Sequence, residues 1–181
     1  MGRTKQFDRT EVLKEAIQLF WKKGYADTSL SDLEKATGVN KSGLYSEFKD
    51  KDDIFLESLK LFSETNPAYA ALKREPYGWQ NIEEFFKSNT TCKGHKGCFL
   101  TNTFREYSII PTKVKTFIDQ NSASVFELFL KNVKATNTKK DPELLAKMIM
   151  TYAGGASLKL NAMKPEALED ETKAFLDMIR N

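Results

Sequence analysis

The stretch from Thr28 to Lys51, TSLSDLEKATGVNKSGLYSEFKDK, constrains the fold more than any other part of the chain. It predicts two short helices joined by a turn at Gly38, because glycine readily adopts the left-handed conformation that ends a helix. Ser29 and Asp32 have the spacing of a capping box for the first helix, and Asn40 is a favourable N-cap for the second. The pattern therefore predicts a helix-turn-helix.

The second of these helices, expected over residues 41–48, is too short to persist alone in water and must be held by its neighbours. Leu44 and Phe48 repeat at four residues and can face a core, whereas lysine, serine and tyrosine side chains fall on the other side. A short helix that presents such groups on a helical support suits a protein that reads the major groove of DNA. The preceding helix shows one apolar stripe, which predicts that it packs in the same unit: Leu13, Ala16, Ile17 and Phe20.

Three consecutive segments, FWKKGYADTSLSDL, ATGVNKSGLYSEF and KDKDDIF, carry a family resemblance. In helix lengths and in the glycine turn they resemble the DNA-binding domain of the TetR family of bacterial transcriptional repressors. The resemblance covers roughly residues 8 to 60.

The resemblance implies an all-α homodimer with two domains. An N-terminal three-helix helix-turn-helix DNA-binding domain would span residues 1–50, and a C-terminal helical ligand-binding and dimerisation domain would span residues 51–181. The implied function is a ligand-responsive regulator, a repressor, which binds a near-palindromic operator in double-stranded DNA and is released by a small-molecule effector. The alternative is a helical dimeric ligand or redox sensor without specific DNA binding.

The resemblance also assigns DNA contacts to seven residues: Thr28, Asn40, Lys41, Ser42, Gly43, Tyr45 and Lys51. The three residues from Lys41 to Gly43 occupy the first turn of the recognition helix, where family members approach base edges. Lys41 can donate to a guanine edge or to a phosphate, and both alternatives stay open. Asn40 can cap the helix or read a base. Thr28, Tyr45 and Lys51 match positions that resemble phosphate contacts.

Two residues depart from the commonest family pattern. Glu34 stands where many members have alanine, and Glu47 stands where histidine or tyrosine is frequent. Because a carboxylate repels phosphates, Glu47 puts the neighbouring backbone contact in doubt. These two residues give the alternative without specific DNA binding its best support.

The remaining chain is expected to be helical. A helix from about residue 51 should stop at Pro67, the stretch up to Trp79 lacks a clear pattern, and further helices are expected over residues 80–89 and 98–108. A long apolar stripe follows Pro111, and Asp141 with Pro142 marks the start of another helix. Glycine within a helix is costly, so residues 154–156 indicate close approach of another helix, with the last helix as the expected neighbour. The resemblance implies that the final two helices form the dimer interface.

Aromatic residues of the second half predict a pocket for an apolar or aromatic effector, although core packing explains most of them equally well. The candidates for the pocket are Trp79, Phe86, Phe99, Phe104, Tyr107 and Phe126. Arg105 and Glu106 can orient a polar group of the effector or simply face solvent, and solvation is the expectation for Glu106.

Cys92, His95 and Cys98 are spaced three residues apart, and three interpretations of them are open. The spacing differs from the usual zinc pairs and no second cluster follows, so no metal is expected. Cys98 could be a redox or electrophile sensor, because a helix N-terminus and nearby cationic groups at residues 93–96 favour a thiolate. The simplest interpretation is a buried, unreactive Cys98.

Composition narrows the function further. One histidine, no Ser–His–carboxylate order and no phosphate loop make an enzyme unexpected, and no cofactor is expected. The net charge of +3 permits nucleic-acid binding without requiring it. No apolar run approaches the roughly 18 residues of a membrane span. No membrane partner is therefore expected. Two cysteines do not make a disulfide framework, so a cytoplasmic protein is expected.

Overall fold

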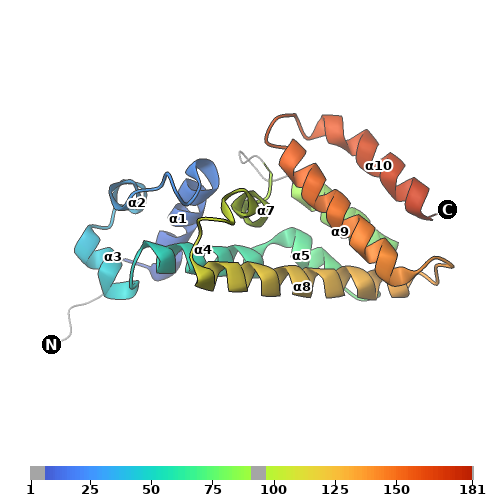
Figure 1. The fold of residues 1–181 in the computed structure, drawn as a ribbon, viewed down its shortest axis with the longest axis horizontal. Coiled ribbons are helices and arrows are strands. Elements are labelled where there is room, and N and C mark those ends of the chain that lie inside the picture. Colours follow the sequence, from blue (N-terminus) through green and yellow to red (C-terminus); the bar gives the residue numbers. More distant parts are fainter. Residues whose placement is uncertain (1–6, 91–96, 181) are drawn as a thin grey trace.

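The computed structural model describes residues 7–90 and 97–180, and within these ranges the chain is all-α, as predicted (Figure 1). The elements are α1 (Arg9–Lys23), α2 (Leu30–Thr37), α3 (Lys41–Glu47), α4 (Lys51–Thr65), α5 (Pro67–Leu72), α6 (Trp79–Thr90), α7 (Phe99–Thr103), the 3₁₀ turn η1 (Phe104–Glu106), α8 (Thr112–Lys134), α9 (Pro142–Lys159) and α10 (Glu166–Arg180). None of the helices in these ranges is long and apolar enough to cross a membrane.

The caps predicted for the helix-turn-helix are present. The Ser29 side chain accepts the Asp32 N–H while the Asp32 side chain accepts the Ser29 N–H, so α2 begins with a complete capping box. Gly38 ends α2 in the left-handed conformation, with φ of 69°. The Asn40 side chain accepts the Gly43 N–H at 2.9 Å and opens α3. Local sequence signals therefore fix both ends of the turn.

One apolar core joins the helix-turn-helix to the helices that follow. Phe20 of α1, Leu44 of α3 and Phe55 of α4 are each at most 1 % exposed and belong to the same cluster. The N-terminal half of α4 thus packs with α1, although the helix starts after the predicted domain boundary at residue 50. The short α3 is held by this packing, as its length requires.

The second half of the chain forms a helical bundle on one side of the helix-turn-helix (Figure 1). The long α8 runs along the molecule, and Phe129 from it packs edge-on against Phe85 of α6. Tyr152 of α9 stacks on Phe175 of α10, with ring centroids 4.0 Å apart, which seats the last helix. Short α7 lies between α1 and α9 near the middle of the molecule (Figure 1).

Three details of this half differ from the sequence expectations. Pro67 both follows α4 and starts the unpredicted α5, because Asn66 caps that helix and proline suits its first position. The helix expected over residues 98–108 is a five-residue helix followed by a 3₁₀ turn. A Cβ added at Gly154 or Gly155 would meet nothing within 4 Å, so α10 does not approach these glycines.

Candidate DNA-reading surface and effector cavity

The first turn of α3 presents an exposed polar surface. Lys41, Ser42 and Ser46 are exposed, and Tyr45 is 41 % exposed. The Lys41 ammonium lies 5.8 Å from the centre of the Tyr45 ring, so the two side chains share one side of the helix. Asn40 is also exposed while its side chain caps α3. This surface offers a cation, hydroxyls and an amide to a ligand that approaches α3.

Gly43 is required by packing inside the motif. A Cβ at this residue would lie 2.7 Å from Cγ1 of Val39, which is closer than side chains tolerate without a shift. The carbonyl of Gly43 accepts the Ser46 hydroxyl at 2.7 Å. Packing against Val39 is therefore sufficient reason for a glycine at residue 43, whether or not the backbone approaches DNA.

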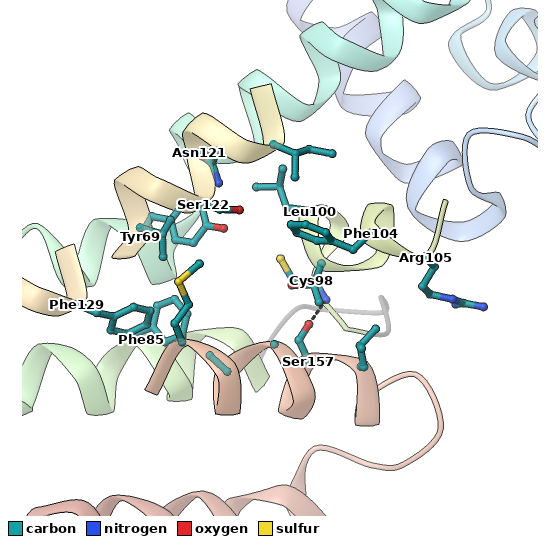
Figure 2. Close-up of a pocket in the computed structure, with 17 residues that line it drawn as sticks. Tyr69, Phe85, Cys98, Leu100, Phe104, Arg105, Asn121, Ser122, Phe129 and Ser157 are labelled. Carbon is teal, nitrogen blue, oxygen red and sulfur yellow. Dashed lines mark hydrogen bonds between the residues drawn. The ribbon is translucent and has the colours of Figure 1, made fainter. Parts of the chain in front are cut away.

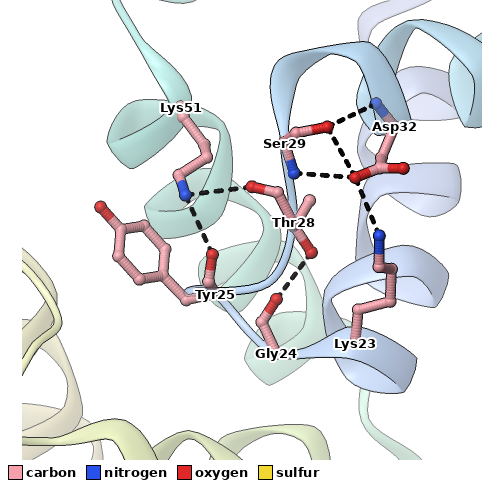
Figure 3. A network of polar contacts seen from close by, with 7 residues as sticks. All are labelled: Lys23, Gly24, Tyr25, Thr28, Ser29, Asp32 and Lys51. Carbon is pink, nitrogen blue, oxygen red and sulfur yellow. Dashed lines mark hydrogen bonds and ion pairs between the residues drawn. The ribbon is translucent and has the colours of Figure 1, made fainter.

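The turn between α1 and α2 is held by a polar network that includes two of the predicted phosphate contacts (Figure 3). The Lys51 ammonium donates to the carbonyls of Tyr25 and Thr28, both at 3.0 Å, and lies 4.2 Å from the centre of the Tyr25 ring. Thr28 is 1 % exposed, and its hydroxyl donates to the Gly24 carbonyl at 2.6 Å. This burial argues against a phosphate contact by the Thr28 side chain.

Tyr25 links the same network to the first turn of α4. Its hydroxyl donates to Oδ1 of Asp52 at 2.5 Å. Burial, followed by the hydrogen bond to Asp52, raises the pKa of Tyr25 far above its usual value, so the phenol stays protonated. The arrangement couples the α1–α2 turn to the start of α4.

A cavity of about 500 Å³ lies between α5, α6, α7, α8 and α9 (Figure 2). Most of its wall is apolar and is formed by Phe85, Leu100, Phe104, Ile118, Val125, Phe129, Met150 and Leu158. Such a volume accommodates a small organic molecule.

Polar groups gather on one side of this cavity: Tyr69, Asn121 and Ser122 (Figure 2). The Ser63 hydroxyl lies 2.5 Å from Oδ1 of Asn121, and the Asn121 side chain also hydrogen-bonds to Tyr69. Burial raises the pKa of Tyr69, so its phenol is neutral and can donate. The cavity thus combines an apolar body with neutral hydrogen-bond donors.

Known proteins are similar both to the sequence of the helix-turn-helix and to the fold of the chain. Residues 12–58, which span α1 to α4, match the family model described as bacterial regulatory proteins, tetR family. The segment from α1 to α4 therefore belongs to the TetR family. It is 36% identical over 108 residues to the HTH-type transcriptional repressor ComR of Escherichia coli K12, a match that covers 56% of this chain and 51% of ComR. The chain therefore spans about half the length of that relative.

Other matches extend over more of the chain. YezE of Bacillus subtilis, an uncharacterised HTH-type transcriptional regulator, is 28% identical over 135 residues, covering 71% of this chain and 70% of YezE. A TetR-family regulator from Agrobacterium tumefaciens has the same fold, with a TM-score of 0.85 over 95% of this chain and 97% of that one at 16% identity. CifR, solved in complex with double-strand operator DNA, has a TM-score of 0.81 over 97% and 98% at 21% identity. The TetR fold thus extends over both halves of the chain.

Most of the residues predicted for the effector pocket lie outside this cavity. Of the six aromatic candidates only Phe104 lines the cavity. Phe99 packs against Trp21 and Phe62 in the core, and the Tyr107 hydroxyl donates to Asp119. The remaining candidates also lie outside it: Trp79 beneath Arg180, Phe86 against Tyr152, and Phe126 against the C-terminal core. The aromatic side chains that do form the wall include Tyr69, Phe85 and Phe129.

Cys98 lies at the edge of this cavity as the N-cap of α7. It is 7 % exposed, its N–H donates to the Ser157 hydroxyl at 2.8 Å, and burial raises the pKa of its thiol. In the described part of its surroundings, burial thus disfavours a thiolate at Cys98 and supports the buried, unreactive interpretation. Cys92, His95 and the lysines at residues 93 and 96 lie outside the described residues, and elsewhere no three potential ligands cluster for a metal.

The helix α9 exposes an apolar stripe, and α10 exposes one methionine. Leu144, Met148 and Leu158 of α9 are 56 %, 40 % and 44 % exposed, and Met178 of α10 is 62 % exposed. Gly155 is also exposed, and an added Cβ there would meet no atom of the same chain. These are the two helices for which the resemblance implies a dimer interface.

Two acidic residues take roles that sequence reasoning missed. Glu34 Oε1 accepts the N–H of Lys41 at 2.5 Å, so the departure from the family pattern becomes a contact between α2 and α3. Glu106, expected in solvent, instead accepts the N–H groups of Tyr25 and Ala26. No local signal marks that second contact, because its partners lie about eighty residues away in sequence.

Proposed function

We propose that this protein is a ligand-responsive transcriptional repressor that binds a near-palindromic operator as a homodimer in the cytoplasm and is released by a small-molecule effector. The observation that carries the proposal is the exposed first turn of α3, with Lys41 and Ser42 on a helix that is capped and packed on three others. A rigid support of this kind is what major-groove reading needs, since base contacts require a fixed register.

Dimerisation supplies the second reading helix. The exposed leucine and methionine side chains of α9 form an apolar stripe that a twofold partner would cover, and Met178 of α10 is exposed as well. Covering it would bring two copies of α3 to one face of the assembly, and half-sites one helical turn apart would match them. Gly155 would let the partner helix come close.

The cavity indicates the chemistry of the effector. An uncharged, mostly apolar molecule fits the aromatic and aliphatic wall, and an acceptor such as a carbonyl would meet the donors of Tyr69 and Asn121. Arg105, at the cavity edge, is the one ionised side chain among the described wall residues. A strongly charged effector would leave its charge largely unpaired inside the cavity.

DNA binding is tested by fluorescence anisotropy with the duplex upstream of the protein's own gene and a scrambled duplex, at several salt concentrations. Lys41→Ala should weaken binding and lower the slope of log K against log salt by about one if the lysine contacts a phosphate. Lys131→Ala removes an exposed lysine of α8 and should change neither value. Equal binding of both duplexes by the unaltered protein would contradict the repressor and favour a sensor that does not bind specific DNA.

Effector binding is tested with Nile red, a neutral apolar dye whose fluorescence rises in apolar surroundings. The dye should bind the protein and weaken its binding to the operator. Val125→Trp fills part of the cavity from α8 and should reduce dye binding, whereas Glu127→Trp, on the exposed side of the same helix, should not. Equal dye binding by all three proteins would show that the cavity is not the site.

A further inference from the structure

Glu106 connects the cavity half of the chain to the helix-turn-helix. Its Oε2 accepts the N–H of Tyr25 at 2.7 Å, and its Oε1 accepts the N–H of Ala26 at 2.8 Å. Each carboxylate oxygen thus holds a different backbone group of the α1–α2 turn. Hydrogen bonds to a charged acceptor are stronger than neutral ones, so the pair is a substantial attachment.

Gly24 leaves room for this carboxylate. A Cβ added at Gly24 would lie 2.8 Å from Oε2 of Glu106, and the residue has a φ of 84°, which favours glycine. Lys51 of α4 also holds this turn, because its ammonium donates to the Tyr25 carbonyl at 3.0 Å. The turn is therefore held through its N–H groups by Glu106 and through a carbonyl by α4.

The segment that carries Glu106 also forms part of the cavity wall. Leu100 and Phe104 of α7–η1 line the cavity, whereas Phe99 faces the opposite way and packs on Trp21 of α1. Figure 2 shows Leu100 and Phe104 beside the cavity, with α1 beyond them. A molecule that presses on the cavity side of this segment therefore presses on the carrier of Glu106.

Two further contacts tie this segment to α9. Asn102 and Asn161 exchange amide hydrogen bonds at 2.9 and 3.3 Å, and the N–H of Cys98 donates to Ser157 at 2.8 Å. The segment thus touches the helix with the exposed apolar stripe at one end and the α1–α2 turn at the other. It forms a short physical connection between the proposed dimer face and the reading module.

We infer that Glu106 is a positioning residue for DNA reading: its carboxylate fixes the α1–α2 turn, and with it α2 and α3, relative to the dimer. Displacement of α7–η1 by a molecule in the cavity would withdraw the carboxylate and loosen the reading helices. The inference rests on the proposed function, whose regulation it specifies. If Glu106 served stability alone, its loss would not change operator binding by the protein that remains folded.

The test compares Glu106→Gln and Glu106→Ala with the unaltered protein. Glu127→Gln and Glu127→Ala, on the exposed side of α8, are matched controls for the lost charge. Hydrogen–deuterium exchange followed by mass spectrometry reports on a peptide that covers residues 24–28. Anisotropy measures binding to the operator and to a scrambled duplex, with the folded fraction checked by circular dichroism.

Exchange of this peptide should quicken about tenfold in Glu106→Ala, the ratio that corresponds to roughly one charge-assisted hydrogen bond. Operator affinity should fall by a similar factor, while affinity for the scrambled duplex changes less than about twofold, since phosphate attraction does not need a fixed register. Glu106→Gln keeps one acceptor, so its exchange rate and operator affinity should lie between those of Glu106→Ala and the unaltered protein. The Glu127 variants should match the unaltered protein in both. Nile red should quicken exchange in the unaltered protein and add little in Glu106→Ala.

Unchanged exchange in Glu106→Ala would overturn the inference, as would quickened exchange with undiminished operator preference. If Glu106→Ala does not fold, Glu106→Gln decides by the same two measurements. If the unaltered protein prefers no duplex, the proposed repressor function fails separately. Exchange would then still decide whether Glu106 and the dye act on the turn.

Discussion

Glu34 Oε1 lies 2.5 Å from the backbone nitrogen of Lys41, so a side chain of α2 caps the reading helix α3. The N–H groups at a helix start lack partners within the helix and favour a negative charge nearby. Asn40 satisfies the N–H of Gly43, and Glu34 satisfies that of Lys41. Glu34, a departure from the commonest family pattern, thus stabilises the element that would contact DNA.

Glu34→Ala should therefore lower the free energy of unfolding by about 1 kcal/mol, the usual cost of losing a helix cap. It should also raise affinity for a scrambled duplex, because a negative charge near the phosphates is removed. Urea unfolding and anisotropy measure the two effects. Glu34→Gln keeps an acceptor for the Lys41 N–H and should retain most of the stability. Full stability in Glu34→Ala would show that the contact contributes nothing.

The role of Lys51 is decided by comparing stability with salt dependence. Because its ammonium donates to two carbonyls, Lys51→Met should lower the free energy of unfolding by about 2 kcal/mol. The salt slope of operator binding should stay unchanged, since the charge serves the turn. Lys49→Met, at an exposed residue nearby, is the control and should leave stability nearly unaltered. A slope lowered by about one with full stability would restore the phosphate contact predicted from sequence.

Acid should weaken the helix-turn-helix through Asp32. Hydrogen bonds from Lys23, followed by those from Ser29, hold the pKa of the Asp32 carboxyl far below its usual value. As the pH falls, the Asp32 carboxyl is therefore protonated in the unfolded chain before it is protonated in the folded protein. The stability that Asp32 contributes is present above about pH 4 and is lost as the pH falls further. Urea unfolding between pH 5 and pH 2.5 should show a shallower decline for Asp32→Asn than for the unaltered protein. Equal declines would show that this carboxylate does not contribute to the acid sensitivity.

The sequence predicted the helix-turn-helix well because its signals are local. Ser29 with Asp32, Gly38 and Asn40 each act within four residues, so spacing alone reveals them. The ambiguity of Pro67 has a similar local origin, since proline can follow one helix and begin the next.

The cavity and the Glu106 contact could not be predicted in this way. Five helices form the cavity wall, and residue type does not tell which aromatic ring faces an empty space and which fills the core. Phe85 and Phe86 are neighbours, yet only Phe85 lines the cavity. Glu106 resembles any exposed acidic residue until the chain brings Tyr25 and Ala26 against it.

The exposed stripe on α9 predicts how the dimer can be broken. Met148→Glu places a charge in the middle of the proposed interface and should shift the protein to monomer at micromolar concentration, because burying an unpaired charge is costly. Ile109→Glu makes the same kind of change at a residue that is 58 % exposed outside these helices, and should leave the dimer intact. Equilibrium sedimentation distinguishes the two. A dimer that survives Met148→Glu would place the interface on another surface.

Cys98 provides a test of whether the cavity has a reactive thiol. Since burial raises the pKa of this thiol, little thiolate is available near neutral pH, and alkylation of the folded protein should be several-fold slower than that of the urea-unfolded chain. Iodoacetamide labelling at pH 8, followed by mass spectrometry of peptides, separates Cys98 from Cys92. Ser157→Ala removes the hydroxyl that accepts the Cys98 N–H, without altering charge, and should raise the rate modestly by loosening the start of α7. Labelling of folded Cys98 faster than the unfolded thiol would contradict the buried, unreactive interpretation and favour a redox or electrophile sensor.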